Sequence, residues 1–436
     1  MSDQSLPVDL VGIGFGPSNL ALAIAIEEYN LTVDPARRLS ARFFDKQDRF
    51  GWHRGMLLPG STMQVAFLKD LATQRNPRSG YTFINYLAER GRLVDFINRQ
   101  DFFPLRIEFH DYLAWAADRV DVAVDYGTEV TSVDTDDDAF VVSHAGGEVR
   151  ARNIVLGGGV RAKLPAGITP GPRIFHNHQV LDHYAELPAL RHNRFAVIGA
   201  GQSAAEVAGF LHEKTDAEVH AVYSKYGYTP ADDSPYANRI FDPSAVDEYF
   251  AAEPAWRERL MHYHRYTNYS AVDPVLIHDL YNREYTERVT GERRFFVHGS
   301  TEITDIAATD DEVVIDVVQR MTGERDRLVC DAVVFATGFE PVPMSDMLGD
   351  LAARCRADHH GQPVLDRLYR VQTDESVPGQ IFVQGNTEHS HGLTATLLSN
   401  VAVRSGEIVG AILDGAGSPN ASVEPATHAS AASRTA

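Results

Sequence analysis

Residues 8–29 read VDLVGIGFGPSNLALAIAIEEY, and this stretch decides how the chain begins to fold. Its first seven residues are an apolar run that predicts a buried strand, and its last twelve carry an apolar stripe that predicts a helix. Between them, Gly12 allows a tight bend and Gly14 lets the backbone approach a pyrophosphate above the helix N-terminus. Pro17 takes the place of the third glycine and suits the first turn of a helix. The stretch therefore predicts a Rossmann-like nucleotide-binding turn.

The next predicted strand, residues 41–45 (ARFFD), supplies the acidic residue that such a unit needs. Asp45 ends this strand, where a carboxylate is expected to bind a ribose hydroxyl. It comes later than the usual spacing of about 20 residues. The polar segment 34–38 (DPARR) accounts for the extra length as a loop.

A second turn of the same kind begins at Gly199, in the sequence GAGQSA. Gly199 ends the predicted strand 195–199 and Gly201 follows it, and Gln202 and Ser203 start a helix from which they can reach phosphate or ribose. The strand at 217–223 leads to a lysine and to no carboxylate. That residue, Lys225, suits a 2′-phosphate, so the second turn predicts NADP rather than NAD. Two turns in one chain suggest two dinucleotides held together.

Length, charge and cysteine content narrow the function classes. The 436 residues exceed what one simple core needs, and a net charge of −20 disfavours nucleic acid and anionic membranes as partners. Cys330 and Cys355 are the two cysteines of the sequence, so there is no CxxC redox centre. With no membrane-length apolar run and no signal-peptide pattern, we expect a cytoplasmic protein without a metal site.

The order of the predicted elements suggests an α/β fold with two Rossmann-like domains and a small, mostly helical substrate-binding portion. The first domain is expected to be discontinuous and the second to be inserted within it. The predicted boundaries are 1–165 and 330–412 for the first domain, 190–329 for the second, about 236–290 for the helical portion, and 413–436 for a disordered tail.

Several longer motifs make the chain recognisable. They occur in this order: GIGFGPSNL, RFGWHRGMLLPGSTMQVAFLKDLATQRNPRS, VIGAGQSAAE, SPYANRIF, TNYS, FATGFEP and TEHSHGLTATLLS. Together they resemble the flavin-dependent N-hydroxylating monooxygenases, specifically the L-ornithine N5-monooxygenases. The resemblance covers roughly residues 8–412, and it implies that the first turn binds FAD and the second NADPH.

The resemblance also implies which residues line each cofactor. Ser203 and its neighbours would hold NADP, and the family usually has arginine where this chain has Lys225. His53 lies on the flavin-lining loop, where a structural role is favoured over that of a general base. With the glycine-turn residues and Asp45, the implied FAD-binding residues are Lys46, Trp52, His53, Gln64, Val130, Thr396, Leu397 and Leu398.

For the substrate, the resemblance implies a clamp around an amino acid. Lys69 would hold the α-carboxylate, and Asn238 and Asn268 would complete the amino-acid end. Ser399 would lie near the reactive side of the substrate, and both Gln64 and Ser399 are candidates for positioning it.

The implied activity is NADPH- and O2-dependent hydroxylation of the δ-amine of L-ornithine through a C4a-hydroperoxyflavin. It would serve hydroxamate siderophore or related peptide biosynthesis, in a homotetramer by analogy. Hydroxylation of the lysine N6 atom stays open, because one methylene of pocket depth decides it. A diamine hydroxylase would not need Lys69, and the missing CxxC opposes a disulfide reductase. An FAD- and NADPH-dependent oxidoreductase without oxygenase activity is the remaining alternative.

Overall fold

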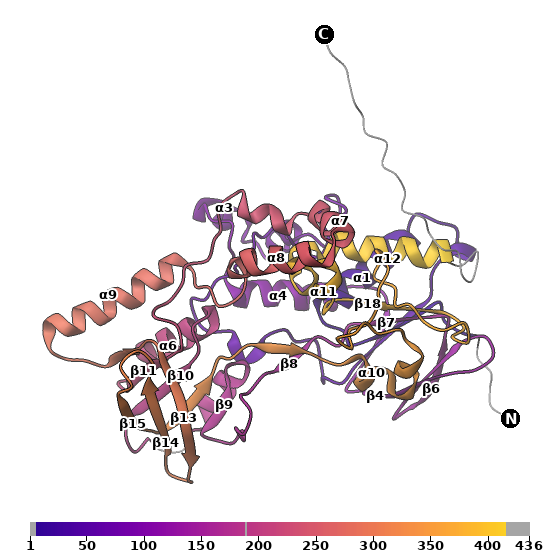
Figure 1. Cartoon of the computed structure of the whole chain (residues 1–436). Coiled ribbons are helices and arrows are strands. Elements are labelled where there is room, and N and C mark those ends of the chain that lie inside the picture. Colours follow the sequence, from indigo (N-terminus) through magenta and orange to yellow (C-terminus); the bar gives the residue numbers. More distant parts are fainter. Residues whose placement is uncertain (1–5, 188–189, 416–436) are drawn as a thin grey trace.

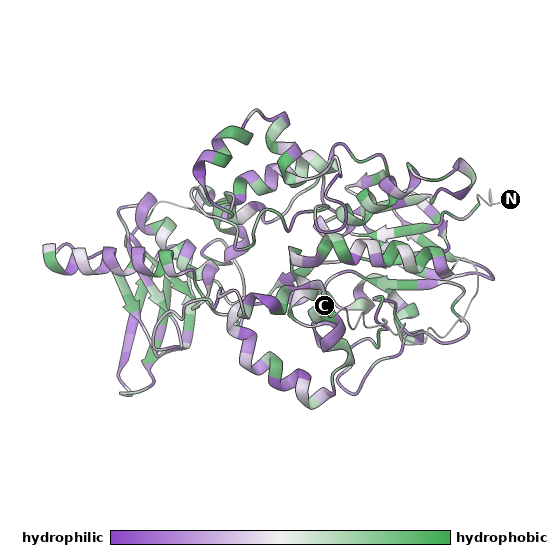
Figure 2. Cartoon of the chain, turned by 90° about the horizontal axis from the view of Figure 1, so that it is seen from above, coloured by the Kyte–Doolittle hydropathy of each residue, from purple (hydrophilic) through white to green (hydrophobic). Residues whose placement is uncertain are grey.

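The computed structural model describes residues 6–187 and 190–415, and it forms two lobes that are each built on a parallel sheet. In Figure 1 the first lobe lies on the right and the second on the left, and extended segments join them. The view from above in Figure 2 shows both lobes again, with helical segments between them. The part of the chain described here contains no helix long and apolar enough to cross a membrane. Of the predicted tail 413–436, residues 413–415 are helical, at the end of the helix Val401–Gly415, and residues 416–436 lie outside the described part.

The sheet of the first lobe has five strands, and every pair of neighbours is parallel. Its order is β18 (Gln380–Val383), β7 (Asn153–Leu156), β1 (Leu10–Ile13), β2 (Ala41–Asp45) and β3 (Ala123–Tyr126). Helix α1 (Pro17–Asn30) packs between this sheet, α4 (Arg106–Ala117) and α12 (Val401–Gly415). Every residue from Asn19 to Ile26 is buried, which explains why the sequence of this helix is apolar on all sides.

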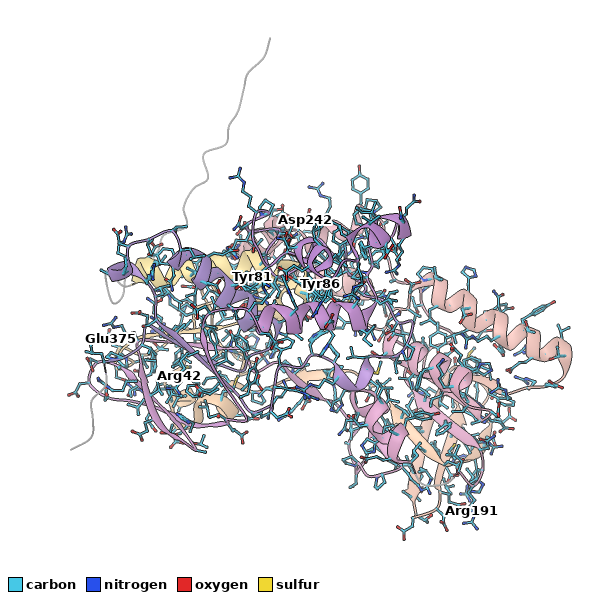
Figure 3. The ribbon with its side chains drawn as sticks, turned by 180° about the vertical axis from the view of Figure 1, so that it is seen from behind. Arg42, Tyr81, Tyr86, Arg191, Asp242 and Glu375 are labelled. Carbon is cyan, nitrogen blue, oxygen red and sulfur yellow. The ribbon has the colours of Figure 1, made fainter. Side chains whose placement is uncertain are left out.

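The opposite face of this sheet is covered by an antiparallel meander and by a short helix. The meander consists of β4 (Val130–Thr135), β5 (Phe140–His144) and β6 (Gly147–Ala151), and α10 (Met344–Leu348) packs beside it. Short helices complete the lobe: α2 (Phe83–Glu89), α3 (Leu93–Arg99) and α11 (Glu388–His391). Aromatic side chains of α2 and α3 and of the segment before α2 pack in one core with α4, and two of them, Tyr81 and Tyr86, are labelled in Figure 3.

The sheet of the second lobe is also parallel, and two separate cores cover its faces. Along β10, Phe195 and Val197 join the core under α6, whereas Ala196 faces the other core, as the alternation of a strand requires. The sheet order is β12 (Phe295–His298), β11 (Glu218–Val222), β10 (Arg194–Ile198), β16 (Ala332–Phe335) and β9 (Ile174–His176). Its covering elements are α5 (Val180–Glu186), α6 (Gln202–Lys214), α9 (Pro274–Thr290), β13 (Thr301–Ala308), β14 (Val313–Gln319) and β15 (Arg325–Cys330).

The chain returns to the first lobe later than residue 330, where the sequence placed the boundary. Strand β16 still belongs to the second sheet, because its buried run AVVF pairs in parallel with β10 and β9. The crossing follows it as β17 (Phe339–Pro341), which pairs with β8 (Val160–Ala162) on the outgoing strand. The boundary is therefore corrected to the segment after Phe335.

The helices predicted within 236–290 form, but they divide between the lobes. Each begins at a proline, which fits the first helical turn: α7 (Pro243–Ala251), α8 (Pro254–His264) and α9. Helix α7 contacts α11 of the first lobe, whereas α9 packs on α6 of the second. The helical portion is thus a connection that reaches both lobes, and its middle segment passes the second glycine turn.

Candidate functional site

The first glycine turn is shaped as a phosphate cradle. Gly14 has a φ of +83°, and a Cβ there would lie 2.5 Å from the carbonyl oxygen of Gly157. Helix α1 starts at once with Pro17, and the first N–H groups of a helix have no acceptor within it. Apart from Gly16 itself and its two chain neighbours, no described residue has an atom within 4 Å of the point where a Cβ of Gly16 would be. Open space, free N–H groups and the positive end of the helix dipole fit a pyrophosphate.

Gly12 differs from its predicted role, because it lies within strand β1. A Cβ at this position would be 2.2 Å from the ring of Phe43, so packing on β2 requires a residue without a side chain.

Asp45, at the end of β2, accepts hydrogen bonds from the N–H of Phe15 at 2.6 Å and of Gln47 at 2.7 Å. The carboxylate is buried and lies beside the turn, at the edge where a ribose would be expected. Lys46 follows it and is exposed, and Val130 begins β4.

The loop after Asp45 places an aromatic pair beside the crossing between the lobes. The ring of Trp52 packs edge-on against His53, with centroids 4.6 Å apart, and His53 also faces Phe339 of β17. The His53 side chain is open to solvent on one side and crowded by protein on the others. This crowding, together with the charges of Arg106 and His178, lowers the pKa of His53 to about 4. The ring is therefore neutral at pH 7, and Gln64 lies further along the same loop with an exposed side chain.

The segment before α12 carries the remaining residues expected at the FAD. Thr396, Leu397 and Leu398 are half-buried, and Ser399 is buried at 5% exposure. Beneath them lies Arg404 of α12, a guanidinium at 2% exposure that the sequence reasoning did not single out. Its position in a helix gave no signal of a site, because arginine is common in helices.

The second glycine turn has the same design as the first. Gly199 has a φ of +143°, and a Cβ there would lie 2.4 Å from the carbonyl oxygen of Ala336. Gly201 caps α6 without a side chain, and Ser203 follows in the first turn, half-buried. Gln202 is engaged within the protein: its amide donates to Glu206 at 2.9 Å, and its oxygen accepts from the N–H of Asp273 at 2.8 Å. The turn fits a second pyrophosphate, with Ser203 better placed for it than Gln202.

Lys225 lies in the loop after β11, as the spacing predicted. Its ammonium donates to the carbonyl oxygen of Ser270 at 2.6 Å and lies 4.8 Å from the ring centre of Tyr266. Burial lowers the pKa of Lys225, and the neighbouring charge of Arg265 lowers it further. The position thus holds two cations, of which the sequence predicted one.

Lys69 belongs to the segment that the structure sets against the helical connection. Its ammonium lies 5.6 Å from the ring centre of Phe241, three residues after Asn238. Burial lowers the pKa of Lys69, and the carboxylate of Asp242 (labelled in Figure 3) offsets part of this effect. Lys69 and the Asn238 segment, predicted from separate motifs, therefore meet.

Contacts between short segments bring the other residues predicted to bind the substrate toward Lys69. The 3-10 turn that contains Asn238 (Ala237–Phe241) packs on the turn that ends at Thr396 (Leu393–Thr396). The amide of Asn238 donates to the carbonyl oxygen of Asp233 at 2.7 Å, which fixes it within its own loop. Asn268 precedes Tyr269, whose hydroxyl donates to Glu388 and lies near the side chains of Asn268 and Thr396. Lys69, Asn238, Asn268 and Thr396 are thus joined through neighbouring contacts, and Ser399 follows three residues after Thr396.

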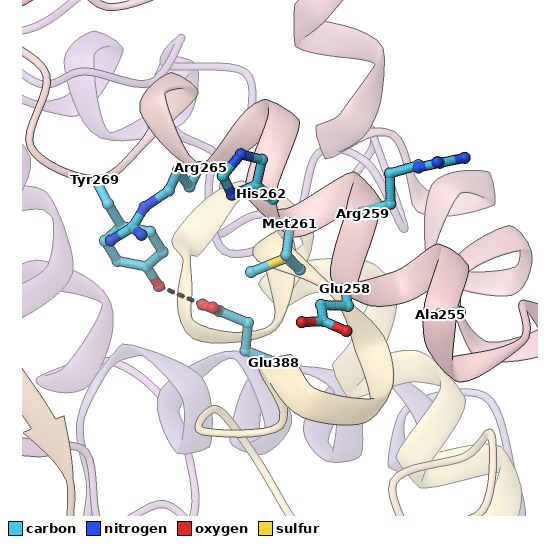
Figure 4. Close-up of a pocket in the computed structure, with 8 residues that line it drawn as sticks. All are labelled: Ala255, Glu258, Arg259, Met261, His262, Arg265, Tyr269 and Glu388. Carbon is cyan, nitrogen blue, oxygen red and sulfur yellow. Dashed lines mark hydrogen bonds between the residues drawn. The ribbon is translucent and has the colours of Figure 1, made fainter.

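A cavity of about 780 Å³ adjoins this group between α8 and α11. Figure 4 shows Tyr269 donating a hydrogen bond to Glu388 across it, with Arg265 beside them. Burial raises the pKa of Glu388, and it raises that of Tyr269 as well. Lys69 and Gln64 are not among the lining residues, so the cavity borders the predicted substrate site and is distinct from it. Tyr269 and Glu388 were missed, although both lie in motifs quoted above.

A buried ion pair ties the two lobes together next to this site. Arg106 of α4 donates to both carboxylate oxygens of Glu206 on α6, at 2.7 and 2.8 Å. It also donates to the carbonyl oxygens of Met56 and Thr62, which lie between His53 and Gln64 in the flavin-lining loop. Residues so far apart in sequence gave no signal of this contact. Residues 6–187 and 190–415 contain no cluster of His, Cys, Asp or Glu suited to a metal ion.

Known proteins resemble this chain over nearly its full length. An L-ornithine N(5)-monooxygenase of Pseudomonas aeruginosa is 37% identical over 420 residues, which are 93% of this chain and 93% of that protein. The structure of an ornithine N-hydroxylase from Kutzneria sp. 744 with reduced FAD, NADP+ and L-ornithine aligns with a TM-score of 0.89 and 43% identity, over 95% of this chain and all of that one. An L-lysine 6-monooxygenase from Pseudomonas syringae aligns with a TM-score of 0.81 and 31% identity, over 93% of this chain and 99% of that one.

The family resemblance inferred from the motifs is confirmed by a sequence model of one family, which matches residues 6–341. The predicted α/β fold with two Rossmann-like domains is confirmed as well, since it is the fold of these structures. The chain belongs to the L-lysine 6-monooxygenase/L-ornithine 5-monooxygenase family.

Proposed function

We propose that this chain is an FAD- and NADPH-dependent L-ornithine N5-monooxygenase. The observation that carries the proposal is the full-length likeness to an ornithine N-hydroxylase solved with reduced FAD, NADP+ and L-ornithine. The reaction converts ornithine, O2, NADPH and a proton into N5-hydroxyornithine, NADP+ and water. Bound FAD would supply the centre that takes up hydride and passes on one oxygen atom.

The residues of the chain would bind and orient the reactants. The turn at Gly14 and the N-terminus of α1 would hold the FAD pyrophosphate, with Asp45 at the ribose. The turn at Gly199, with Ser203, would hold that of NADPH. Thr396, Leu397 and Leu398 would line the flavin, and the crossing between the lobes would keep water away from it.

Lys69 would hold the α-carboxylate of ornithine, because an ammonium in a half-buried position gains most from an anion. The side chains of Asn238, Asn268 and Ser399 would complete the site. Among the alternatives, a diamine lacks the carboxylate that Lys69 would bind. Lysine keeps the carboxylate and differs by one methylene, so the identity of 43% to an ornithine enzyme against 31% to a lysine enzyme favours ornithine.

The proposal includes three finer points. A destination of the product in hydroxamate siderophore or related peptide synthesis and a homotetrameric assembly rest on the family alone, and a cytoplasmic location rests on the sequence pattern described above. Mass measurement of the purified protein in solution tests the assembly, and deletion of its gene followed by a siderophore assay tests the destination.

The test of the function is a hydroxylamine assay of the purified protein with ornithine, lysine, putrescine and cadaverine, each with NADPH or NADH. We expect hydroxylamine from ornithine with NADPH at more than ten times the kcat/KM for lysine. Product from lysine in preference to ornithine would reverse the substrate assignment. Consumption of NADPH with stoichiometric peroxide and no hydroxylamine from any substrate would instead indicate an oxidoreductase without oxygenase activity.

A further inference from the structure

Arg404 of α12 is a fully buried cation without a carboxylate partner in the described chain. Its side chain is 2% exposed, and its three hydrogen bonds all go to uncharged oxygens. It donates to Gln384 Oε1 at 3.2 Å, to the carbonyl oxygen of Ala395 at 2.7 Å and to Ser18 Oγ at 3.2 Å. Burial lowers the pKa of Arg404, which reflects the cost of removing this charge from water. A buried charge of this kind needs an anion nearby.

A carboxylate does lie on the same helix, but another arginine binds it. Glu407 accepts from Arg367 at 2.9 and 3.3 Å, and Arg367 also donates to Asp247 at 2.6 Å. Arg367 and Arg404 lie at the same distance, 5.9 Å, from the ring centre of Tyr369. The two arginines thus share one aromatic ring, but Arg367 alone has acidic partners. Arg404 is directed to the other side, toward the first glycine turn.

The three acceptors of Arg404 belong to the three segments that meet at that turn. Ser18 lies in the first turn of α1, Gln384 directly follows β18, and Ala395 precedes Thr396. Gln384 in turn donates to the carbonyl oxygen of Ser18 at 3.1 Å and to Asn19 Oδ1 at 3.3 Å. Asn19 donates to the carbonyl oxygen of Gly14 at 2.7 Å. One network therefore links the guanidinium to the backbone of the glycine turn.

We propose that Arg404 is a positioning residue for FAD, with a charge that is compensated by the pyrophosphate of the bound cofactor. The phosphates would lie at the N-terminus of α1, where Ser18 of the first turn accepts a hydrogen bond from the guanidinium. Arg404 also fixes the carbonyl of Ala395, and through it the start of the segment Thr396–Leu398 that would line the flavin. The inference rests on the proposed FAD site and holds whichever amine the enzyme hydroxylates.

The test compares Arg404→Met with Arg367→Met, which removes an arginine from the same Tyr369 ring. FAD is stripped from each protein, the dissociation constant of FAD is measured by quenching of its fluorescence, and Tm is measured with and without FAD. We expect Arg404→Met to weaken FAD binding at least tenfold and to reduce the gain in Tm on adding FAD. Arg367→Met should lower both Tm values alike and change the FAD dissociation constant less than twofold.

A third variant, Arg404→Lys, keeps the positive charge and loses the planar guanidinium with its several N–H donors. It should therefore bind FAD more tightly than Arg404→Met. Arg404→Gln replaces Arg404→Met if the latter does not fold. Unchanged FAD affinity in the neutral variant, or equal losses in the Lys and neutral variants, would overturn the proposal. These measurements need no turnover: a chain that binds FAD but does not hydroxylate ornithine would refute the proposed function and leave this inference standing.

Discussion

Lys69 combines two properties that a carboxylate clamp needs, a half-buried position and a charge that is incompletely compensated. Asp242 raises its pKa, yet burial is the larger effect and the net direction is downward. The lysine therefore loses its proton at a lower pH than a free lysine does. The substrate amine imposes the opposite requirement, because it reacts as the neutral base and its free pKa is about 10.4.

These opposing requirements predict a bell-shaped dependence of kcat/KM for ornithine on pH. Activity should rise into mildly alkaline pH as the δ-amine loses its proton, and it should fall once Lys69 becomes neutral. Lys69→Arg keeps its charge at every accessible pH, so the alkaline fall should move upward. Lys69→Met should raise the KM for ornithine about 10- to 100-fold, in line with the loss of a charged hydrogen bond. Steady-state kinetics from pH 6 to 10 measures both the pH profile and the KM, and the rate of flavin reduction by NADPH is the control. An unchanged KM for ornithine in Lys69→Met would refute binding of the α-carboxylate by Lys69.

Individual residues could be predicted from sequence where a local rule dictated them. Gly14 and Gly199 have the backbone geometry that their motifs demand, and Asp45 lies at the predicted turn. The sequence places Gln202 at the second turn but does not predict its partners, Glu206 on the same helix and the N–H of Asp273. Glu388 was passed over because its partner Tyr269 lies 119 residues away. Partners at such separations are set by tertiary packing, which a single sequence does not encode locally.

At the scale of elements, the segment Arg265–Asp273 between α8 and α9 connects the parts of the site. Its Ser270 has a φ of +56° and accepts from Lys225, and the Cα of this residue would be 3.5 Å from a Cβ at Gly201. Tyr269 of the same segment reaches Glu388 of the first lobe. The sequence predicted helices here but could not predict their division between lobes, because that depends on which faces pack. The segment thus places Asn268, which is expected to contact the substrate, beside the expected NADP site.

This segment also places a second cation, Arg265, beside Lys225, at the position where the resemblance implies arginine. Arg265 lies 5.8 Å from the ring centre of Tyr266, on which Lys225 also lies, and it forms no ion pair within the described residues. Arg265→Ala should therefore weaken binding of 2′,5′-ADP about tenfold and leave binding of 5′-AMP unchanged. Titration calorimetry measures both, and Arg259→Ala, on the ring of Trp256 in α8, is the matched control. Equal losses for the two nucleotides would exclude recognition of the 2′-phosphate by Arg265.

At the scale of the whole molecule, two parallel sheets are joined by chain crossings, by apolar contacts such as those of Met56 and Leu58 with the second core, and by a buried ion pair. The chain crosses between the lobes along β8 and β17 and again through the helical portion, and a buried polar contact between them is the pair Arg106–Glu206, at 12% and 7% side-chain exposure. The sequence predicted both sheets from their glycine turns and apolar runs. It missed the pair and placed the crossing too early, since strand β16 is apolar enough for either sheet. Local patterns specify each lobe, whereas the contact between lobes depends on residues 100 positions apart.

The interlobe pair should therefore matter for stability more than any surface ion pair. Arg106→Met leaves a buried carboxylate without its partner, and we expect a loss of about 3–5 kcal/mol in the free energy of unfolding. Arg106→Met combined with Glu206→Leu removes both charges and should recover much of this loss, because the desolvation cost disappears as well. Arg320→Ala breaks the exposed pair with Glu302 and should cost about 0–1 kcal/mol. Urea unfolding of the unmodified protein and the three variants, followed by circular dichroism, measures these free energies. A loss of unfolding free energy in Arg106→Met no larger than that in Arg320→Ala would mean that the lobes are held together mainly by apolar contacts.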